Sequence, residues 1–328
     1  MSILVTGVAG FIGYHTARAL LKRGDRVIGV DNLNNYYDAR LKEARLAVLQ
    51  GVAGFSFVKL DVADRDGVLE LTAANKDITG IIHLAAQAGV RNSLKNPHSY
   101  IDANIMGTVV VLEAARRIDQ LSAVTYASSS SVYGANSKRP SSVDDRVDKP
   151  VSLYAASKRS CELIAHSYFH LYGLPLTGLR YFTAYGPWGR PDMAAWLFTE
   201  AILADRPIRV FNEGRMARDF TYIDDIVAGT IAAHDRPAAS SGGDAPTHRI
   251  YNLGNHKPEP LLDFIAVIEQ VVGRTAKKQL LPMQPGDVAE SFADIDTARR
   301  DLGFEPKVSI EEGIARFVAW YKEYHHIG

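Results

Sequence analysis

Cysteine is almost absent from this chain of 328 residues, in which Cys161 is the single example. One cysteine excludes an internal disulfide framework and any zinc site built from several thiolates, and we expect no metal site. Net charge is also missing, because 37 Lys and Arg residues face 37 Asp and Glu residues. This balance argues against a protein that binds nucleic acid through a broad basic surface.

Long apolar runs are missing as well. No stretch reaches the roughly 18 apolar residues that a membrane span needs, so we expect no membrane partner. The chain starts with Met1-Ser2-Ile3-Leu4-Val5, which leads into a strand-like segment without a basic leader. Together these absences predict a soluble, cytoplasmic, globular protein.

Short apolar runs alternate with helical patterns through the first half of the chain. Five runs are typical of buried strands, and the segments between them carry apolar residues at helical spacing. Such alternation predicts parallel strands joined by right-handed crossovers, hence an α/β fold with a Rossmann-type doubly wound sheet. The runs are Ile3–Thr6, Arg26–Val30, Phe55–Leu60, Ile81–Leu84 and Ala123–Ala127, and helical segments include Tyr14–Lys22, Thr108–Arg117 and Leu153–His170.

The pattern is interrupted after about residue 183 by several Gly and Pro residues. We expect residues 1–183 to form a first domain to which later segments return, and residues 184–328 to form mainly a smaller second domain. Pro237–Pro246 is rich in Ala, Ser and Gly and predicts a surface loop. A capping-box pattern from Ser309 to Glu312 predicts the start of a final amphipathic helix.

A glycine-rich turn, Thr6-Gly7-Val8-Ala9-Gly10-Phe11-Ile12-Gly13, follows the first strand. Gly7, Gly10 and Gly13 let the backbone turn tightly and approach a pyrophosphate, whose charge then meets the amino terminus of a helix. The spacing is G-x-x-G-x-x-G and not the more specific G-x-G-x-x-G. A turn of this kind also occurs without a ligand, so its context decides the interpretation.

Acidic and small residues at the next strand ends supply that context. Asp31 closes the second strand, where a carboxylate accepts hydrogen bonds from an adenosine ribose and repels a 2′-phosphate, which favours NAD over NADP. Asp61 follows the third strand near the expected adenine, and the small residues Ala85 and Ala86 follow the fourth. The sequence therefore predicts a domain that binds NAD. The further predicted cofactor contacts are Phe11, Ile12, Asn32, Asn35, Val62, Leu84 and Tyr181.

A Tyr and a Lys lie four residues apart in Tyr154-Ala155-Ala156-Ser157-Lys158, which we predict to be helical. This spacing puts Tyr154 and Lys158 on one helical face. An ammonium near a phenol lowers the pKa of the phenol, and the resulting phenolate can act as a general base near neutral pH. The serine run Ser128–Ser131 ends the fifth strand and offers a hydroxyl to the same substrate oxygen. Together with the glycine turn, this pattern predicts a catalytic site that also contacts NAD.

These motifs resemble the extended short-chain dehydrogenase/reductase family over nearly the whole chain. The resemblance implies NAD-dependent, reversible hydride transfer on a nucleotide sugar, with Tyr154 and Lys158 as catalytic residues. Counting back from Tyr154, as in the family's UDP-galactose 4-epimerases, selects Ser129 as the catalytic hydroxyl, while Ser131 competes for that role and Ser130 contacts the substrate. The family's 4,6-dehydratases place an Asp-Glu pair in this segment, so an all-serine run argues against dehydration.

Three further stretches resemble the UDP-glucuronate 4-epimerase branch of the family. UDP-galactose 4-epimerases usually carry Asn where this chain has Thr183, and Arg where it has Gln284. The resemblance implies inversion of C4 of UDP-glucuronate, giving UDP-galacturonate through a transient 4-keto sugar. Two alternatives stay open: 4-epimerisation of neutral UDP-hexoses and decarboxylation of UDP-glucuronate. A non-enzymatic NAD-sensing scaffold is disfavoured because the Tyr-Lys pair is intact. The stretches are Leu179–Ala194, Ala85–Arg91 and Arg218–Asp225.

The C6 carboxylate of a uronate sugar calls for a cation in the substrate site. A guanidinium grips a carboxylate through two charge-assisted bonds, and we assign this role to Arg190 together with Thr183. The pair would hold the carboxylate out of the alignment in which a β-keto acid loses carbon dioxide. Arg91 either faces the sugar or orders its loop. The resemblance further implies that Arg218 meets the diphosphate and that Phe211 and Asp287 line the nucleotide.

The resemblance also suggests an oligomer. Extended short-chain dehydrogenases pair through two long helices, which correspond here to the segments near Tyr100–Arg117 and Leu153–Tyr172. We therefore expect a homodimer. The sequence itself shows only that both segments carry apolar positions.

Overall fold

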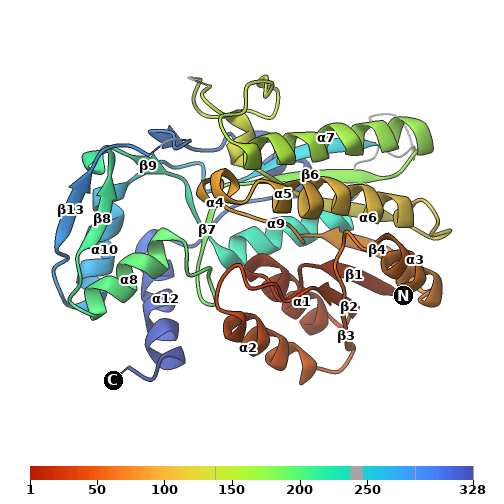
Figure 1. The fold of residues 1–328 in the computed structure, drawn as a ribbon, viewed down its shortest axis with the longest axis horizontal. Helices are drawn as coiled ribbons and strands as arrows, with labels where there is room; N and C mark the ends of the chain where they lie inside the picture. The colour runs from red at the N-terminus through yellow and green to blue at the C-terminus, as the bar shows by residue number, and fades with distance from the viewer. Residues whose placement is uncertain (137, 237–246, 285, 328) are drawn as a thin grey trace.

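Seven parallel strands form the central sheet of the computed structural model, which describes residues 1–136, 138–236, 247–284 and 286–327 (Figure 1). The strand order is β11-β6-β5-β4-β1-β2-β3. Because the order reverses between β1 and β4, a crevice opens there at the carboxyl ends of the strands. The predicted doubly wound α/β fold is confirmed. The strands are β1 (Ser2–Thr6), β2 (Arg26–Asp31), β3 (Phe55–Lys59), β4 (Ile78–His83), β5 (Ala123–Ser129), β6 (Leu176–Tyr181) and β11 (His248–Leu253).

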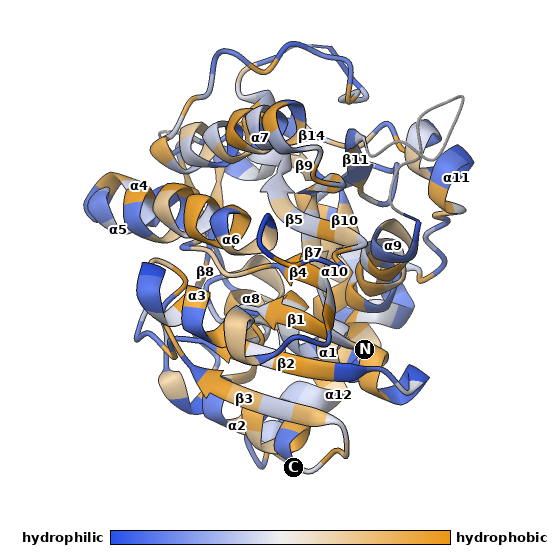
Figure 2. Ribbon diagram, turned by 90° about the vertical axis from the view of Figure 1, so that its right-hand side faces the viewer, coloured by the Kyte–Doolittle hydropathy of each residue, from blue (hydrophilic) through white to orange (hydrophobic). Residues whose placement is uncertain are grey.

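Alternate residues of β1 show how helices cover both faces of the sheet. Ile3 and Val5 pack in one core cluster with Leu20 of α1, while Leu4 packs in another with Val111 of α6. Figure 1 shows α1, α2 and α9 on one side of the sheet and α3, α6 and α7 on the other. Figure 2 shows hydrophobic strands between these helix layers. The helices are α1 (Phe11–Arg23), α2 (Ala39–Gln50), α3 (Arg65–Ala74), α6 (Gly107–Ala115), α7 (Leu153–Tyr172) and α9 (Ile223–Asp235).

Strand β4 starts three residues earlier than predicted, at Ile78, and continues through Gly80. A glycine in this position suggests a break in the strand when only the sequence is considered. In the structure an ideal Cβ at Gly80 would lie 2.4 Å from Nε2 of His234, a residue of α9. Gly80 therefore allows a helix to approach the strand closely and does not end it.

A smaller lobe of short strands and helices follows β6 and lies beside the sheet (Figure 1). One large core cluster joins the two parts, with Phe11 of α1 and Phe264 and Phe317 of the smaller lobe among its members. Strand β11 and helix α9 lie after residue 184 but belong to the central sheet and its helix layer. The predicted loop Pro237–Pro246 lies outside the described residues. The elements of the lobe are β7 (Thr183–Tyr185), α8 (Ala194–Leu203), β8 (Ile208–Phe211), η3 (Asn212–Gly214), β9 (Ala217–Arg218), β10 (Phe220–Tyr222), β12 (Glu259–Pro260), α10 (Leu261–Val272), β13 (Lys278–Leu281), β14 (Glu290–Ser291) and α12 (Ile310–Tyr324). Helix α11 (Asp296–Leu302) packs against β11 and α9.

The final helix begins as the sequence predicts. At the start of α12, Oγ of Ser309 accepts a hydrogen bond from the backbone N–H of Glu312 at 3.3 Å. Ile314 and Phe317 then face the core. Ser129 caps the short helical turn after β5 in a similar way.

Of the helices in the described ranges, none is long and apolar enough to cross a bilayer. Three short segments complete the chain around the sheet: α4 (Val90–Lys95), α5 (His98–Tyr100) with the π-helical η1 (Ile101–Met106), and η2 (Ser130–Tyr133).

Candidate active site

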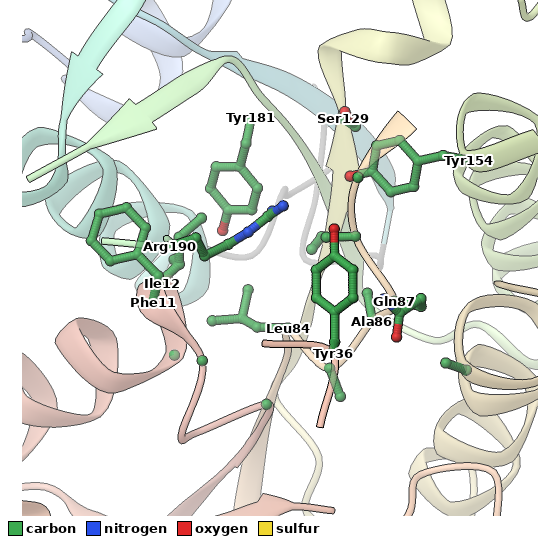
Figure 3. Close-up of a pocket in the computed structure, with 18 of the residues that line it drawn as sticks. Phe11, Ile12, Tyr36, Leu84, Ala86, Gln87, Ser129, Tyr154, Tyr181 and Arg190 are labelled. Carbon is green, nitrogen blue, oxygen red and sulfur yellow. The ribbon is translucent and has the colours of Figure 1, made fainter. Parts of the chain in front are cut away.

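A cavity of about 360 Å³ lies where the strand order reverses, at the carboxyl ends of the central strands. It brings together the predicted cofactor contacts and the predicted catalytic residues (Figure 3). Asn35 is the one predicted cofactor contact that does not line it. The predicted residues that do are Gly7, Gly10, Phe11, Ile12, Gly13, Asp31, Asn32, Asp61, Val62, Leu84, Ala85, Ala86, Ser129, Ser130, Ser131, Tyr154, Lys158, Tyr181, Thr183 and Arg190.

The glycine turn packs the first strand tightly against the first helix. An ideal Cβ at Gly13 would lie 2.0 Å from the carbonyl oxygen of Gly7, and Gly7 itself has a φ of +71°. Gly10 caps α1 without any side-chain hydrogen bond, so the first N–H groups of the helix face the cavity. A bare helix terminus of this kind binds a phosphate anion well.

Asp31 is held rigidly at the end of β2. Its Oδ2 accepts a hydrogen bond from the N–H of Ala9 at 3.1 Å, and its Oδ1 accepts one from the N–H of Leu33 at 2.8 Å. Asn32 donates to Oδ2 of Asp61 at 2.8 Å, which connects the ends of β2 and β3. Each carboxylate oxygen of Asp31 keeps a lone pair for a ribose hydroxyl, so the turn, the helix terminus and this acid fit NAD.

Two cations of α2 were missed by the sequence analysis. Lys42 lines the cavity and donates to Oδ1 of Asn34 at 2.7 Å, and burial lowers its pKa although Asp31 opposes the shift. Arg45 is fully buried and donates to the carbonyls of Ala9 and Trp188 at 2.9 and 2.6 Å. The signal was present, because helical spacing puts both cations on the same buried face as the leucines of α2.

Tyr154 and Lys158 lie in the first turns of α7, which is capped by Ser152. Figure 3 shows the Tyr154 hydroxyl directed into the cavity. Lys158 is buried, and its Nζ donates to the carbonyl of Ala127 at 2.9 Å, near the end of β5. The helix start therefore brings the predicted pair to the strand end that carries the serine run.

Ser128 and Ser129 of that run have different hydrogen-bond partners. Ser128 donates to Oε1 of Glu162 at 2.6 Å, so its proton is directed into the core. Oγ of Ser129 accepts a hydrogen bond from the backbone N–H of Ser131 at 3.2 Å, which leaves its own proton available to a ligand. Ser129 lies on the same side of the cavity as Tyr154 (Figure 3).

Arg190 reaches into the cavity from the loop between β7 and α8 (Figure 3). Its Nε and Nη2 donate to the two carboxylate oxygens of Asp192 at 3.0 and 2.6 Å. Burial raises the pKa of Asp192, but the neighbouring Arg190 outweighs burial and brings the pKa below its usual range. The other predicted carboxylate contact, Thr183, lines the same cavity.

Phe211, Arg218 and Asp287, which are predicted to meet the nucleotide or its diphosphate, lie outside the residues that line this cavity, together with Arg91, which is predicted to face the sugar or to order its loop. Nη2 of Arg91 lies 3.1 Å from Oδ2 of Asp287, and its guanidinium lies over the ring of Phe211 at 4.7 Å from the centroid. Arg218 donates to the carbonyl of Val288 at 2.7 Å, and burial lowers its pKa.

In the described ranges no group of three His, Cys, Asp or Glu residues could hold a metal ion.

A doubly wound sheet with a glycine turn, an acid at the end of the second strand and a Tyr-Lys pair in one crevice defines an NAD-binding enzyme of the short-chain dehydrogenase type. The sequence model of the NAD dependent epimerase/dehydratase family matches residues 3–254, and the chain belongs to this family. UDP-glucuronate 4-epimerase 4 of Arabidopsis thaliana is 47% identical over 334 residues, covering 99% of this chain and 76% of that protein. Protein CapI of Staphylococcus aureus is 48% identical, covering 99% of both chains.

A solved structure resembles the whole chain. The UDP-glucuronic acid 4-epimerase from Bacillus cereus, in complex with UDP-glucuronic acid and NAD, superposes with a TM-score of 0.90. It is 36% identical and the match covers 99% of this chain and 100% of that chain. The expected dependence on NAD is confirmed.

Proposed function

We propose that this chain inverts C4 of UDP-glucuronate and gives UDP-galacturonate through a transient 4-keto sugar, with NAD as its cofactor. One observation carries the substrate assignment: the guanidinium of Arg190 lies in the same cavity as Tyr154 and Ser129. A uronate places its C6 carboxylate close to C4, so a cation belongs beside the catalytic groups. The related Bacillus cereus enzyme, which is solved with UDP-glucuronic acid and NAD, supports the same substrate.

The cofactor site of the proposal consists of the glycine turn, the amino terminus of α1 and Asp31. The turn and the helix terminus would hold the pyrophosphate, and Asp31 the hydroxyls of the adenosine ribose. NAD, when bound, supplies the acceptor and donor of hydride for C4. Since hydride returns to the same sugar, the reaction consumes no cofactor.

Tyr154 transfers the proton at O4. As a phenolate it takes the proton of the C4 hydroxyl, and it returns that proton when the 4-keto group is reduced from the opposite face. Ser129 donates a hydrogen bond to O4, because its contact with Ser131 does not use its proton. The backbone N–H of Ser131 orients the Ser129 hydroxyl by donating to its Oγ. Lys158, anchored on Ala127, places a positive charge beside the phenolate.

Individual arginines bind the negative charges of the substrate, although the chain as a whole has no net charge. Arg190 and Thr183 would hold the C6 carboxylate, and Ser130 would face the sugar. Arg218 would meet the diphosphate, because it is a half-buried guanidinium close to Arg91 and Asp287. Arg91, Phe211 and Asp287 would form the wall of the nucleotide site.

The test is to incubate the purified protein with UDP-glucuronate, adding no NAD, and to identify the product by NMR. UDP-galacturonate is the expected product. Release of carbon dioxide with a UDP-pentose would instead identify a decarboxylase. Arg190→Ala should lose activity on UDP-glucuronate far more than any activity on UDP-glucose, with the surface variant Arg299→Ala as the matched control. An equal loss on both substrates would remove Arg190 from the carboxylate site.

We further propose that the chain works as a homodimer through η1, α6 and α7. Large apolar side chains on these helices are exposed: Ile101 by 41%, Met106 by 51%, Leu163 by 53% and Leu171 by 66%. A second copy would bury them. Sedimentation velocity should give twice the chain mass for the wild type and for the control Leu280→Glu, and the single-chain mass for Leu163→Glu. A monomeric wild type would contradict this.

A cytoplasmic location is the last part of the proposal. The lone cysteine, Cys161, is buried and accepts a hydrogen bond from Thr108 at 3.3 Å, so it acts as a small core residue. A chain without disulfides suits a reducing compartment. Cell fractionation should recover the protein with cytoplasmic markers, and recovery in a secreted fraction would contradict the assignment.

A further inference from the structure

We propose that Asp192, held by Tyr36, is a positioning residue that fixes the guanidinium of Arg190 and thereby keeps a uronate intermediate from losing carbon dioxide. The inference rests on the proposed function, because it concerns how Arg190 treats a C6 carboxylate. It adds two residues that the proposed reaction does not otherwise use.

Asp192 occupies one edge of the Arg190 guanidinium. Nε and Nη2 both donate to its carboxylate, at 3.0 and 2.6 Å. Nη1 makes no hydrogen bond to any other described residue, and in Figure 3 the tip of the side chain points toward the centre of the cavity. Arg190 therefore offers the sugar a single, oriented edge, whereas a free guanidinium could rotate to follow a moving carboxylate.

Tyr36 fixes Asp192 in turn. Its hydroxyl donates to Oδ2 of Asp192 at 2.9 Å, so the carboxylate accepts three hydrogen bonds in all. Tyr36 comes from the loop between β2 and α2, whereas Arg190 and Asp192 lie in the loop between β7 and α8. We call Tyr36, Asp192 and Arg190 together the clamp. The clamp joins the loop that follows Asp31, the proposed ribose contact, to the loop that carries Arg190, the proposed carboxylate contact.

Gly89 shows that this approach is close. It lies in the loop after β4 with a φ of +99°, and an ideal Cβ there would lie 2.5 Å from the Tyr36 hydroxyl and 3.7 Å from Nη2 of Arg190. Tyr100 secures the same loop, because its hydroxyl donates to the carbonyl of Gly89 at 2.6 Å. Three loops therefore meet at the clamp, and only glycine leaves room for them.

The clamp also removes net charge from the sugar end of the cavity. Both members are ionised near neutral pH, because the pKa of Asp192 is lowered and the pKa of Arg190 is raised by Asp192 against the effect of burial. Their formal charges cancel. At close range the free edge of the guanidinium still binds the C6 carboxylate, but the pair attracts anions only weakly from a distance, so Arg190 contributes more to geometry than to ground-state affinity.

Geometry matters because oxidation at C4 converts the uronate into a β-keto acid. In decarboxylation the C5–C6 bond breaks, its electron pair moves toward the C4 carbonyl oxygen to form an enolate, and carbon dioxide leaves. A proton is then taken up at C5. The step requires the C5–C6 bond to align with the π system of the carbonyl. A fixed guanidinium edge can keep the carboxylate out of that alignment while the ketosugar turns.

The test measures two products from UDP-[6-13C]glucuronate: UDP-galacturonate and labelled carbon dioxide. In Asp192→Asn the guanidinium loses its charged partner, so we expect kcat for epimerisation to fall about tenfold while KM stays level or falls. We expect the ratio of carbon dioxide to UDP-galacturonate to rise by about tenfold or more. Tyr36→Phe, which removes only the hydroxyl, should move the product ratio in the same direction by a smaller factor.

Asp25→Asn is the matched control. Arg23 and Asp25 repeat the Arg-x-Asp spacing at the surface, with Nε 2.6 Å from Oδ2, and their side chains are 40% and 30% exposed, against 22% and 35% for Arg190 and Asp192. This variant should keep the wild-type kcat, KM and product ratio. Thermal unfolding and NAD content of each variant show whether it is folded.

The outcomes separate this inference from the proposed function. A wild type that does not make UDP-galacturonate overturns both. An active wild type with an unchanged product ratio in Asp192→Asn overturns the clamp alone, even if kcat falls, because a merely structural loss reduces the active fraction without altering partition. A raised ratio in both clamp variants, with the control unchanged, supports it.

Discussion

Arg180 and Glu162 form a bidentate ion pair directly behind the strand end that carries the serine run. Nε and Nη2 of Arg180 lie 2.8 and 2.9 Å from the two carboxylate oxygens of Glu162, and both side chains are almost fully buried. Ser128 donates to the same carboxylate. The pair ties β6 and α7 to β5, and so fixes Ser129 relative to the helix that carries Tyr154.

Glu162→Gln should therefore destabilise the fold strongly. The substitution leaves the guanidinium of Arg180 buried without its counter-charge, which costs about 3–5 kcal/mol in comparable pairs. Urea unfolding measures the loss. Glu200→Gln, which removes a half-exposed partner of Arg206, should change the free energy of unfolding by less than about 1 kcal/mol. Similar losses in the two variants would contradict the structural role of the buried pair.

Tyr154→Phe should abolish most activity without affecting the fold. It removes the hydroxyl that we propose exchanges the proton of the C4 hydroxyl, and general base catalysis of this kind contributes about 10²–10⁴-fold to kcat. Tyr172→Phe, at the exposed end of the same helix, should keep wild-type kcat. If the active-site variant retained more than a tenth of wild-type kcat, another group would have to be the base.

Arg45 links the cofactor turn to the loop that carries Arg190. Its guanidinium donates to the carbonyl of Ala9 in the glycine turn, and to the carbonyls of Trp188 and Gly189 in the second loop. Arg45→Met leaves these buried acceptors unpaired, so we expect a loss of about 2–4 kcal/mol in stability and NAD lost on gel filtration. Arg40→Met, on the exposed side of the same helix, should retain NAD as the wild type does. Full NAD occupancy in Arg45→Met would show that the link is dispensable.

Acid should unfold the protein through its buried histidines. Burial lowers the pKa of His15, His234 and His248 to about 4 and that of His83 to about 3. Histidine in the unfolded chain has a pKa near 6.5, so between about pH 6.5 and 4 the unfolded state binds more protons than the folded state. The free energy of unfolding contributed by these neutral histidines is therefore fully present above pH 6.5 and is lost as the pH falls from 6.5 to about 4.

The size of the effect can be measured for a single histidine. Each one contributes up to about 1.4 kcal/mol per pH unit to the slope of unfolding free energy against pH. His15→Gln should reduce the slope between pH 6 and 5 by about that amount. His170→Gln, on the exposed face of α7, is the matched control for the substitution itself. An unchanged slope in His15→Gln would mean that His15 is not buried as a neutral ring.

The sequence predicts those parts of the molecule that depend on local pattern. Alternation of strand and helix predicted the sheet, and the glycine turn with Asp31 predicted the position of the cofactor site, because the carboxyl ends of parallel strands meet at one edge. The Tyr-Lys spacing predicted a shared helical face. Each of these rests on periodicity or on a motif of a few neighbouring residues.

Contacts between distant loops could not be read from the sequence. Tyr36 and Asp192 are 156 positions apart, and nothing in either segment marks one as the partner of the other. The same holds for Gly80, which suggests a strand break until His234 is seen packed against it. These features depend on how the loops and layers are brought together, which only the folded chain specifies.

The fate of the hydrogen at C4 decides whether the chain inverts C4 by transient oxidation. UDP-[4-2H]glucuronate is incubated with the purified protein in ordinary water, without added NAD, and the product is examined by NMR and mass spectrometry. The account predicts UDP-galacturonate that retains deuterium at C4, because hydride leaves and returns to the same carbon. Loss of the deuterium to solvent during turnover would contradict it.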